Sequence, residues 1–381
     1  MNAITNSSTV RQVVRGYSNG MDLNKSGGGE LELVNPVIGG RLVMDSGSPL
    51  ALRSESGVTV TVNSNGGGAS AGPLSYLGPG SFLTSRIYPY SAAVPVKFDE
   101  GAIVWITTHN KAKDGLIVAG GKDRYLLAGR CTIGSRFTDP MTELLRAVTI
   151  EFTDAAVGAT VTTDNVDGTP ITIQTTCNAA ASTRNNSCFR GTGRFNIGGH
   201  GMFVFNPQTT FEHTGTTFVE ADATAVVKPS VEISASPVTV AGTLRFEGGV
   251  LARPVTVASG GLLEYPGAAS LGGITLEAGA KVRIAVAADG SVASARCAVT
   301  PPEEGKAEME LAFAEGSVVE PNAAFALTSG AGLARASAAR FEARATCGGA
   351  AFAADLIAKP LVENGELVVV FRPRGTMIYL R

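Results

Sequence analysis

Two stretches of the chain match each other residue by residue: residues 254–265 read PVTVASGGLLEY, and residues 273–284 read GITLEAGAKVRI. Each contains a short alternation of apolar and polar residues, a corner of small residues, and a second alternation. A period of two residues buries one face of a strand and leaves the other in water. Residues 237–240 and 243–246 form a third copy once two corner residues are omitted. Short copies without a helical period predict the coils of a β-solenoid.

One such coil is not stable alone. About six inward apolar side chains contribute roughly 1.5–3 kcal/mol each when fully buried. Ordering about 18 residues costs roughly 1–2 kcal/mol per residue in backbone entropy. Coils above and below must therefore share the burial and supply the hydrogen bonds of parallel strands. The three copies predict further coils on both sides, and thus an all-β, parallel β-helix.

The composition supports this fold class. Charged residues make up 17% of the 381 residues, against about 25% in a typical soluble protein. The 47 glycines exceed the usual share of about 7%. Low charge with many Gly and Thr residues suits a secreted β protein with tight corners. The net charge is −2 and the basic residues are scattered, which argues against a nucleic-acid partner.

The organisation follows from the strand patterns. Residues 1–25 are polar and predict an N-terminal cap or a frayed end, and residues 26–300 predict the solenoid. Residues 64–96 and 178–190 are polar and irregular, which predicts two loops extruded from the solenoid wall. Residues 301–381 mix Ala-rich segments with strand patterns, and they predict a β-rich C-terminal cap over an aggregation-prone edge.

Other local signals are few. Asp139 followed by Pro140 predicts one or two helical turns over residues 139–147. The first residues lack a basic region and an apolar run, so we expect no signal peptide within the sequence. No window approaches 18 apolar residues, so we expect no membrane helix.

A family resemblance begins at Gly201. Residues 201–205 (GMFVF), 209–211 (TTF) and 214–221 (TGTTFVEA) resemble the autotransporter-associated β-strand repeat, also called the passenger-associated transport repeat. That motif runs Gly-x-Leu-x-Leu, Asn-Thr-Tyr and Thr-Gly-x-Thr-x-Val-x-x-Gly. The resemblance implies a right-handed parallel β-helix on, or released from, the bacterial surface.

The match has departures. Thr209 stands in place of Asn, Phe211 in place of Tyr, and Asp222 in place of the last Gly, while Glu212 and His213 form a two-residue insertion. The translocating barrel of the family is not expected here. Eight strands of about 9–11 residues would fill residues 301–381 without turns.

Glycoside hydrolysis requires two carboxylates about 5–10 Å apart in one groove. The nearest candidates are Asp164 and Asp167 in a polar turn. Asp residues in such corners usually satisfy local backbone groups. We therefore predict no catalytic residues.

The repeat frame places Arg245, Glu264 and Arg283 at one outward position on successive coils. We expect a charge ladder of alternating sign, with exposed pairs worth well under about 1 kcal/mol. On this basis Glu264→Ala is nearly silent, whereas Val255→Asp unfolds the region.

No metal site or cofactor is predicted. His109, His200 and His213 share no metal-ligand spacing, and the loop at 120–123 (GGKD) lacks the third Gly of a calcium-binding repeat. No nucleophile elbow or dinucleotide fingerprint is present.

Other residue types give open alternatives. Trp105, Tyr88 and Tyr90 form either a sugar-stacking platform or part of the core. The five cysteines are too dispersed for a disulfide framework. Free thiols are favoured over bridges, for which the candidate pairs are Cys177 with Cys188 and Cys297 with Cys347.

The sequence favours a non-enzymatic, extracellular scaffold or adhesin whose loops contact surface glycans or proteins of host or neighbouring cells. The alternative is a carbohydrate-active β-helix, either a polysaccharide lyase or a tailspike-like depolymerase. A groove with three or more convergent charged side chains would favour the enzyme, and a Thr/Val/Ala face would favour the scaffold. The partner and the oligomeric state stay open.

Overall fold

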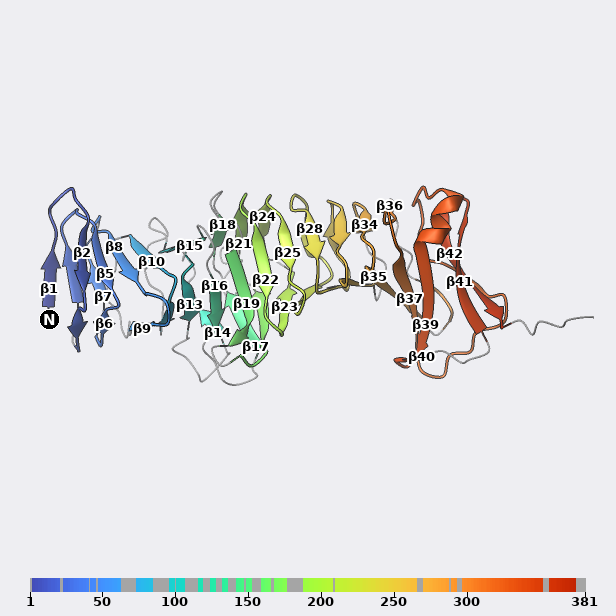
Figure 1. Cartoon of the computed structure of the whole chain (residues 1–381), viewed down its shortest axis with the longest axis horizontal. Coiled ribbons are helices and arrows are strands. Elements are labelled where there is room, and N and C mark those ends of the chain that lie inside the picture. The colour runs from blue at the N-terminus through green and yellow to red at the C-terminus, as the bar shows by residue number, and fades with distance from the viewer. Residues whose placement is uncertain are drawn as a thin grey trace, which may run out of the picture. The chain divides into compact units, whose positions relative to one another are not determined.

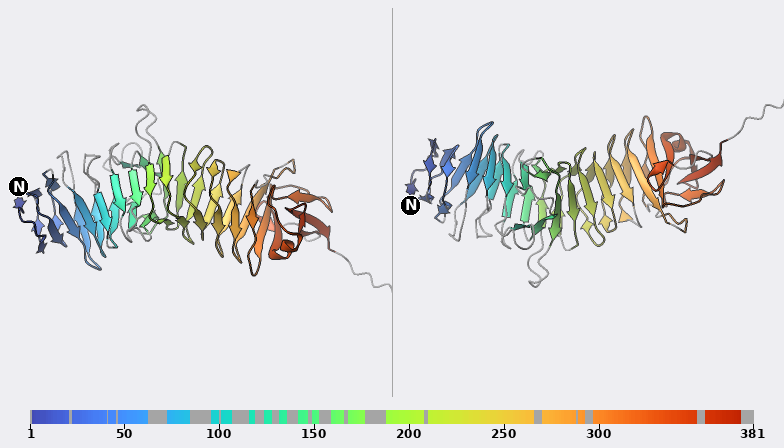
Figure 2. Two further views of the ribbon diagram at one scale, coloured as in Figure 1. Left: turned by 90° about the horizontal axis from the view of Figure 1, so that it is seen from above. Right: turned by 90° about the horizontal axis from the view of Figure 1, so that it is seen from below.

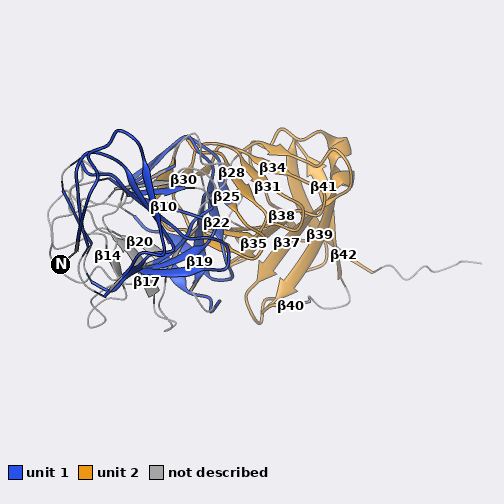
Figure 3. Cartoon of the chain, turned by 60° about the vertical axis from the view of Figure 1, so that its left-hand side comes forward, with its two compact units in different colours: residues 1–218 blue, residues 219–381 orange. Residues whose placement is uncertain are grey.

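The computed structural model describes the residues 2–20, 23–40, 42–45, 47–62, 73–84, 96–99, 101–106, 116–118, 124–127, 132–135, 142–146, 149–152, 159–165, 168–176, 188–207, 210–265, 270–287, 289–292, 297–351 and 356–374. It divides into two compact units, residues 1–218 (unit 1) and 219–381 (unit 2) (Figure 3). Among the described residues the elements are strands, apart from the 3-10 helix η1 (Arg335–Arg340).

Unit 1 is a solenoid of parallel strands (Figure 1). One sheet has nine strands in the order β2 (Gln12–Arg15), β5 (Leu31–Val34), β8 (Leu50–Arg53), β10 (Leu74–Leu77), β12 (Val96–Asp99), β15 (Arg124–Leu127), β18 (Thr149–Phe152), β21 (Cys188–Gly191) and β24 (Thr210–His213). A second row holds β3 (Ser18–Asn19), β6 (Val37–Ile38), β9 (Thr59–Val62), β11 (Ser81–Thr84), β13 (Ile103–Ile106), β16 (Thr132–Ser135), β19 (Ala159–Asn165) and β22 (Phe195–Gly198).

Two shorter rows complete unit 1. One contains β1 (Asn2–Thr5), β4 (Leu23–Ser26) and β7 (Leu42–Met44); the other contains β14 (Leu116–Val118), β17 (Thr142–Arg146), β20 (Thr172–Thr176) and β23 (Met202–Phe205). Consecutive strands lie in different rows, and each pairs with a strand one coil later. This is the topology of a β-solenoid.

The core of unit 1 consists of columns of inward side chains. Leu33 registers with Leu52, Leu52 with Tyr76, and Tyr76 with Phe98, and all four are buried. The rings of Tyr76 and Phe98 stack with centroids 5.6 Å apart. Each coil thus covers the apolar face of its neighbour.

Unit 2 stacks in the same manner (Figure 2). Its longest parallel row contains β26 (Thr224–Val227), β29 (Thr243–Phe246), β32 (Leu262–Tyr265), β35 (Lys281–Val286), β37 (Ala307–Phe313) and β39 (Phe341–Cys347). Other rows contain β28 (Val238–Val240), β31 (Val255–Val257), β34 (Ile274–Leu276) and β36 (Val299–Thr300), and β27 (Glu232–Ile233), β30 (Val250–Leu251) and β33 (Ser270–Leu271). The strand β25 (Thr217–Val219) contains the unit boundary.

The predicted repeat frame is confirmed. Val255 pairs with Val238 and Ile274, and Glu264 pairs with Arg245 and Arg283, as the aligned copies require. The all-β, parallel solenoid is thereby established within each unit.

Of the two alternatives for residues 1–25, the frayed end is wrong, because β1, β2, β3 and β4 already pair in parallel with later strands. The helical turns expected over residues 139–147 are absent from the described part, since residues 142–146 form β17 between β14 and β20. Non-local strand pairing prevails there over a local capping signal.

The two extruded loops also require correction. Residues 73–84 of the first predicted loop contain β10 and β11. Residues 188–190 of the second belong to β21. The remaining positions of the two predicted loops, 64–72, 85–95 and 178–187, lie outside the described residues, and Val96 is the first residue of β12.

The parallel solenoid extends beyond residue 300, where the sequence predicts its end. Parallel stacking continues beyond residue 300 through β37 and β39, and β40 (Ala350–Ala351) folds back antiparallel on β39. The predicted β-rich cap is present as the antiparallel sheet of β38 (Ala324–Ala326), β42 (Glu366–Pro373) and β41 (Leu356–Glu363).

Candidate functional site

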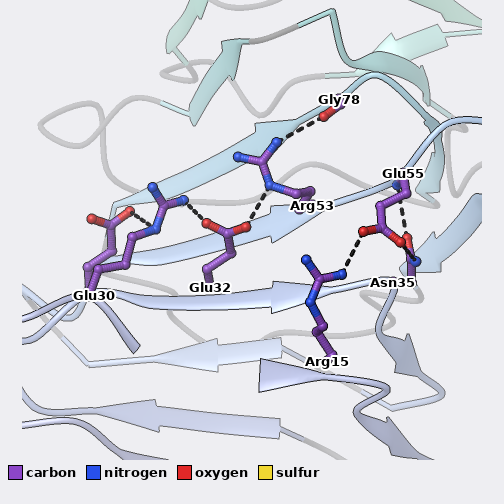
Figure 4. Close-up of polar contacts among 8 residues, drawn as sticks. Arg15, Glu30, Glu32, Asn35, Arg53, Glu55 and Gly78 are labelled. Carbon is purple, nitrogen blue, oxygen red and sulfur yellow. Dashed lines mark hydrogen bonds and ion pairs between the residues drawn. The ribbon is translucent and has the colours of Figure 1, made fainter. Parts of the chain in front are cut away.

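A charged cluster lies on the outer face of unit 1, over β2, β5 and β8 (Figure 4). Glu32, whose side chain is 7% exposed, lies between two arginines. Its Oε1 accepts from Arg53 Nε at 2.6 Å, and its Oε2 pairs with Arg11 Nη2. Arg53 Nη1 also donates to the carbonyl oxygen of Gly78 at 3.1 Å. Both carboxylate oxygens are therefore engaged by neighbouring coils.

Glu55 forms the second half of this cluster (Figure 4). Its Oε1 accepts from Arg15 Nη1 at 2.6 Å, and its Oε2 accepts from Asn35 Nδ2 at 2.8 Å. The hydrogen bonds from Arg15 and Asn35 lower the pKa of Glu55. Asn35 has a φ of 49°, a left-handed conformation that Asn tolerates better than most residues.

The charge ladder of unit 2 joins three successive strands. Arg245 Nε donates to Glu264 Oε2 at 2.9 Å, and Arg283 Nη1 donates to Glu264 Oε1 at 2.6 Å. The alternation predicted from the repeat frame is thus confirmed. The Glu264 side chain is only 13% exposed, however, so the ladder is less solvated than we expect from the sequence.

Two more coils extend this ladder. Glu310 and Arg344 follow Arg283 in register. Glu310 is buried; its Oε2 accepts from Arg283 Nε at 3.0 Å, and its Oε1 accepts from Thr346 Oγ1 at 2.8 Å. Burial lowers the pKa of Arg283, but its contacts with Glu310 and Glu264 outweigh this effect and raise the pKa overall.

A small cavity of about 120 Å³ lies beside the ladder. Ala285 and Ala312, paired across β35 and β37, leave room there because their side chains are short. The cavity is lined by Arg245, Glu264, Tyr265, Arg283, Ala285 and Ala312. Three charged side chains from adjacent coils therefore converge, but direct ion pairs join them to one another.

Glu264→Ala should lower the free energy of unfolding of unit 2 by about 1–2 kcal/mol, because the half-buried guanidinium of Arg245 loses the acceptor of its Nε and that of Arg283 keeps only its contact with Glu310. This exceeds the near-silent effect expected for an exposed pair. Hydrogen exchange of the β29, β32 and β35 amides measures the change. Glu342→Ala is the matched control, since its pair with Lys306 is exposed on both sides and we expect a loss below about 0.5 kcal/mol. Equal effects of the two variants would contradict the burial argument.

Asp164 lies at the end of β19, against the corner that contains His200. Asp164 Oδ1 accepts from the His200 backbone N–H at 2.7 Å, and Oδ2 contacts His200 Nδ1 at 2.8 Å. The carboxylate thus satisfies a backbone donor of the next coil. Asp167, its predicted companion, lies outside the described residues.

His213 is buried in the aromatic core of unit 1. Its Nε2 donates to the carbonyl oxygen of Gly193 at 2.6 Å, which fixes the Nε2-protonated tautomer. Its ring packs against Phe152, Phe195 and Phe211. Burial lowers the pKa of His213, and the hydrogen bond to Gly193 offsets only part of this.

Unit 1 should lose stability as the pH falls below about 6.5, the pKa of an unfolded histidine. Between that value and the lowered pKa of His213, the unfolded chain binds a proton that the folded unit does not, so stability is complete above the window and decreases within it. The slope is at most about 1.4 kcal/mol per pH unit. Urea unfolding between about pH 5 and 7, followed by the fluorescence of the single tryptophan, Trp105 in β13, measures it.

His213→Gln keeps a donor near Gly193 and removes the titration, so the slope should disappear in this variant. An unchanged slope in His213→Gln would show that other groups cause the pH dependence.

The other residues that the sequence offers as site candidates are not brought together with a site among the described residues. Trp105 is half-buried in β13, whereas Tyr88, Tyr90, His109 and residues 120–123 lie outside the described residues. Cys297 and Cys347 are free thiols, so this candidate pair is unbridged, and burial raises the pKa of Cys297 to about 11. Cys131 and Cys177 lie outside the described residues.

Two searches of the described residues give negative results. No group of three or more His, Cys, Asp or Glu side chains there is arranged to hold a metal ion. No helix there has the length and apolar character needed to cross a membrane.

The sequence frame missed Glu310, Arg344 and Thr346, because the coil length grows after residue 284. In unit 1 it also missed Glu32 and Glu55. For Glu32 the sequence contains a signal that could have found it. The alternation Glu-Leu-Glu-Leu at residues 30–33 places its two carboxylates on the outward side.

Comparisons with protein-family models, with curated proteins and with solved structures give no match for this chain.

Proposed function

We propose that this chain is a non-enzymatic β-solenoid scaffold that works outside the cell or on the bacterial surface and presents its outer faces to binding partners. The observation that carries the proposal is the mutual pairing of the outer charges. Glu32, Glu264 and Glu310 each use both carboxylate oxygens in contacts with side chains of other coils. Groups held in this way stabilise stacking instead of exchanging protons with a substrate.

The location is argued from other features. The low share of charged residues and the many glycines are typical of secreted β proteins. The resemblance of residues 201–221 to the passenger-associated transport repeat points in the same direction. Both arguments for the proposed location come from the sequence. A direct test of the location is protease treatment of intact cells of the source organism, followed by immunoblotting. Cleavage of the chain on intact cells supports surface placement; full protection contradicts it.

One observation favours the carbohydrate-active alternative. The cavity beside the ladder is lined by Arg245, Glu264 and Arg283, three charged side chains on adjacent coils. Glu264 and Glu310 lie two strands apart, which at about 4.8 Å per strand gives a separation of roughly 10 Å, close to the upper limit for an inverting glycosidase. Arg283 lies between them and binds one oxygen of each carboxylate, while Arg245 and Thr346 bind the other oxygens.

A turnover assay separates the two functions. The full chain is incubated with neutral and uronate-containing polysaccharides, and reducing ends and unsaturated uronates are measured. We expect no release above the buffer level. Steady release that Glu264→Gln or Glu310→Gln abolishes, and that Glu32→Gln leaves intact, would overturn the scaffold proposal.

A further inference from the structure

A groove of about 540 Å³ lies in the C-terminal cap of unit 2, where η1 packs against β41 (Figure 1). One wall comes from η1 and the residues that lead into it, with Leu333, Arg335 and Ala338. The other wall is the end of the hairpin that joins β41 to β42, residues 361–365. The volume falls within the range of small-ligand sites, roughly 300–1,000 Å³.

Hydrogen bonds hold the two walls of this groove together. The Leu333 N–H donates to the carbonyl oxygen of Gly365 at 2.9 Å. The carboxylate of Glu366, directly after the turn, accepts from Thr328 Oγ1 at 2.9 Å and from the Gly330 N–H at 2.5 Å. The hairpin is thus tied to the segment that precedes η1. Because both walls are already ordered, a ligand can bind without a large loss of backbone entropy.

The buried lining of the groove is apolar, and its exposed lining carries opposite charges. Leu333 and Val362 are only 7% and 8% exposed. Arg335 lies on the η1 side, whereas Glu363 and Asn364 lie on the hairpin side, and all three are exposed. Within the part of the chain that the structure describes, none of these three side chains has a hydrogen-bond or ion-pair partner.

This arrangement differs from the ladder of unit 2. There, Arg283 binds Glu264 and Glu310 directly. In the groove, Arg335 and Glu363 line one space but belong to different walls and form no ion pair with each other. An ion of a single sign would be attracted by one of these side chains and repelled by the other. A ligand with one positive and one negative group is complementary to both.

We propose that the groove binds a small zwitterion with an apolar body, either an amino acid or a short peptide with free ends. Its carboxylate pairs with Arg335, because a guanidinium can donate two parallel hydrogen bonds to a carboxylate. Its ammonium group donates to the side-chain oxygens of Glu363 and Asn364. Its apolar side chain contacts Leu333 and Val362, the buried part of the lining.

This inference goes beyond the proposed scaffold function and does not depend on it. A ligand groove in the cap is compatible with an enzyme as well as with a scaffold. The binding test below and the turnover assay above therefore fail independently.

The probes are leucine and the tripeptide Ala-Leu-Ala, the latter with free ends, with an acetylated N-terminus or with an amidated C-terminus. Each is titrated into the full chain by isothermal titration calorimetry. We expect the free tripeptide to bind at least about threefold more tightly than either blocked form, as for the loss of one exposed ion pair. The tighter of leucine and the free tripeptide identifies the source of the zwitterion. Raising NaCl from about 50 mM to about 500 mM should weaken the binding of both.

Three variants assign the two charged contacts. Arg335→Gln should weaken the free tripeptide at least about threefold and make C-terminal amidation almost without effect. Glu363→Gln should do the same for N-terminal acetylation. Arg340→Gln is the matched control, because Arg340 ends the same helix η1 but does not line the groove, and binding should stay unchanged. Thermal unfolding verifies that each variant folds.

Three results would overturn the proposal. The first is no binding of leucine or of the free tripeptide at about 10 mM. The second is equal binding of the free and the blocked tripeptides. The third is an effect of Arg340→Gln as large as that of Arg335→Gln, which would place the ligand outside the groove.

Discussion

Val255→Asp should unfold the coils of unit 2 around β31 and destabilise the unit by about 4–5 kcal/mol. Val255 is fully buried, and its inward neighbours in the column are Val238 and Ile274 on the adjoining strands. The substitution removes an apolar side chain and places a buried carboxylate between Val238 and Ile274, whose side chains offer it no hydrogen bond. The aspartate must then be protonated or reach water by opening the coil.

Hydrogen exchange with mass spectrometry on the full chain measures this effect. Peptides that cover β28, β31 and β34 should lose their protection, and far-ultraviolet circular dichroism should lose β signal. Thr256→Asp is the matched control, because Thr256 is the next residue of the same strand and points outward, beside Thr239 and Thr275. We expect a cost below about 1 kcal/mol for the control. Tolerance of Val255→Asp, or equal damage from Thr256→Asp, would reverse the assignment of the inward face.

The register around Val255 was predictable from the sequence for a specific physical reason. A one-residue shift would turn Val255 and Val257 outward and Thr256 inward, so the apolar pattern permits a single register. The same constraint places Glu264 between Arg245 and Arg283. A parallel solenoid with repeated coils translates this local pattern directly into three-dimensional neighbours.

The pattern fails where coil length varies. The interval from Glu264 to Arg283 is one regular coil, but Glu310 follows Arg283 only after a longer insertion, and nothing in the local sequence aligns the two. Gly- and Pro-rich composition was equally misleading around residues 73–84, because strands of four residues fit between such corners. At residues 142–146 a local helix signal yields to pairing with strands far away in the sequence.

The contacts and the burial of the candidate site residues could not be predicted from the sequence for a different reason. Spacing alone does not show that Asp164 reaches the corner of His200, 36 residues away, or that His213 faces the aromatic core. Burial also changes the meaning of a predicted contact: the Glu264 ladder is where the sequence places it, but its carboxylate is largely shielded from water. Pairing follows from periodicity, whereas exposure depends on neighbouring side chains.

Gly215→Ala should destabilise unit 1 by about 2–3 kcal/mol, the second largest effect that we expect. A Cβ added at Gly215 would overlap the backbone carbonyl oxygens of Gly193 and Thr192, at distances that real Cβ atoms do not show. Backbone atoms of the neighbouring coil cannot move aside as a flexible side chain would. Gly215 is also the glycine of the Thr-Gly element in the repeat-like stretch, so this element marks a place where two coils come into close contact.

Gly28→Ala is the matched control in the same unit. Gly28 has an ordinary φ, is exposed, and would have no atom within 4 Å of an added Cβ. We expect a change within about 0.5 kcal/mol, with slight stabilisation if the unfolded chain loses entropy. Urea unfolding followed by Trp105 fluorescence compares both variants in one unit. If Gly215→Ala were as mild as Gly28→Ala, the coils could separate locally at little cost, and close backbone contact would not explain why glycine occupies these corners.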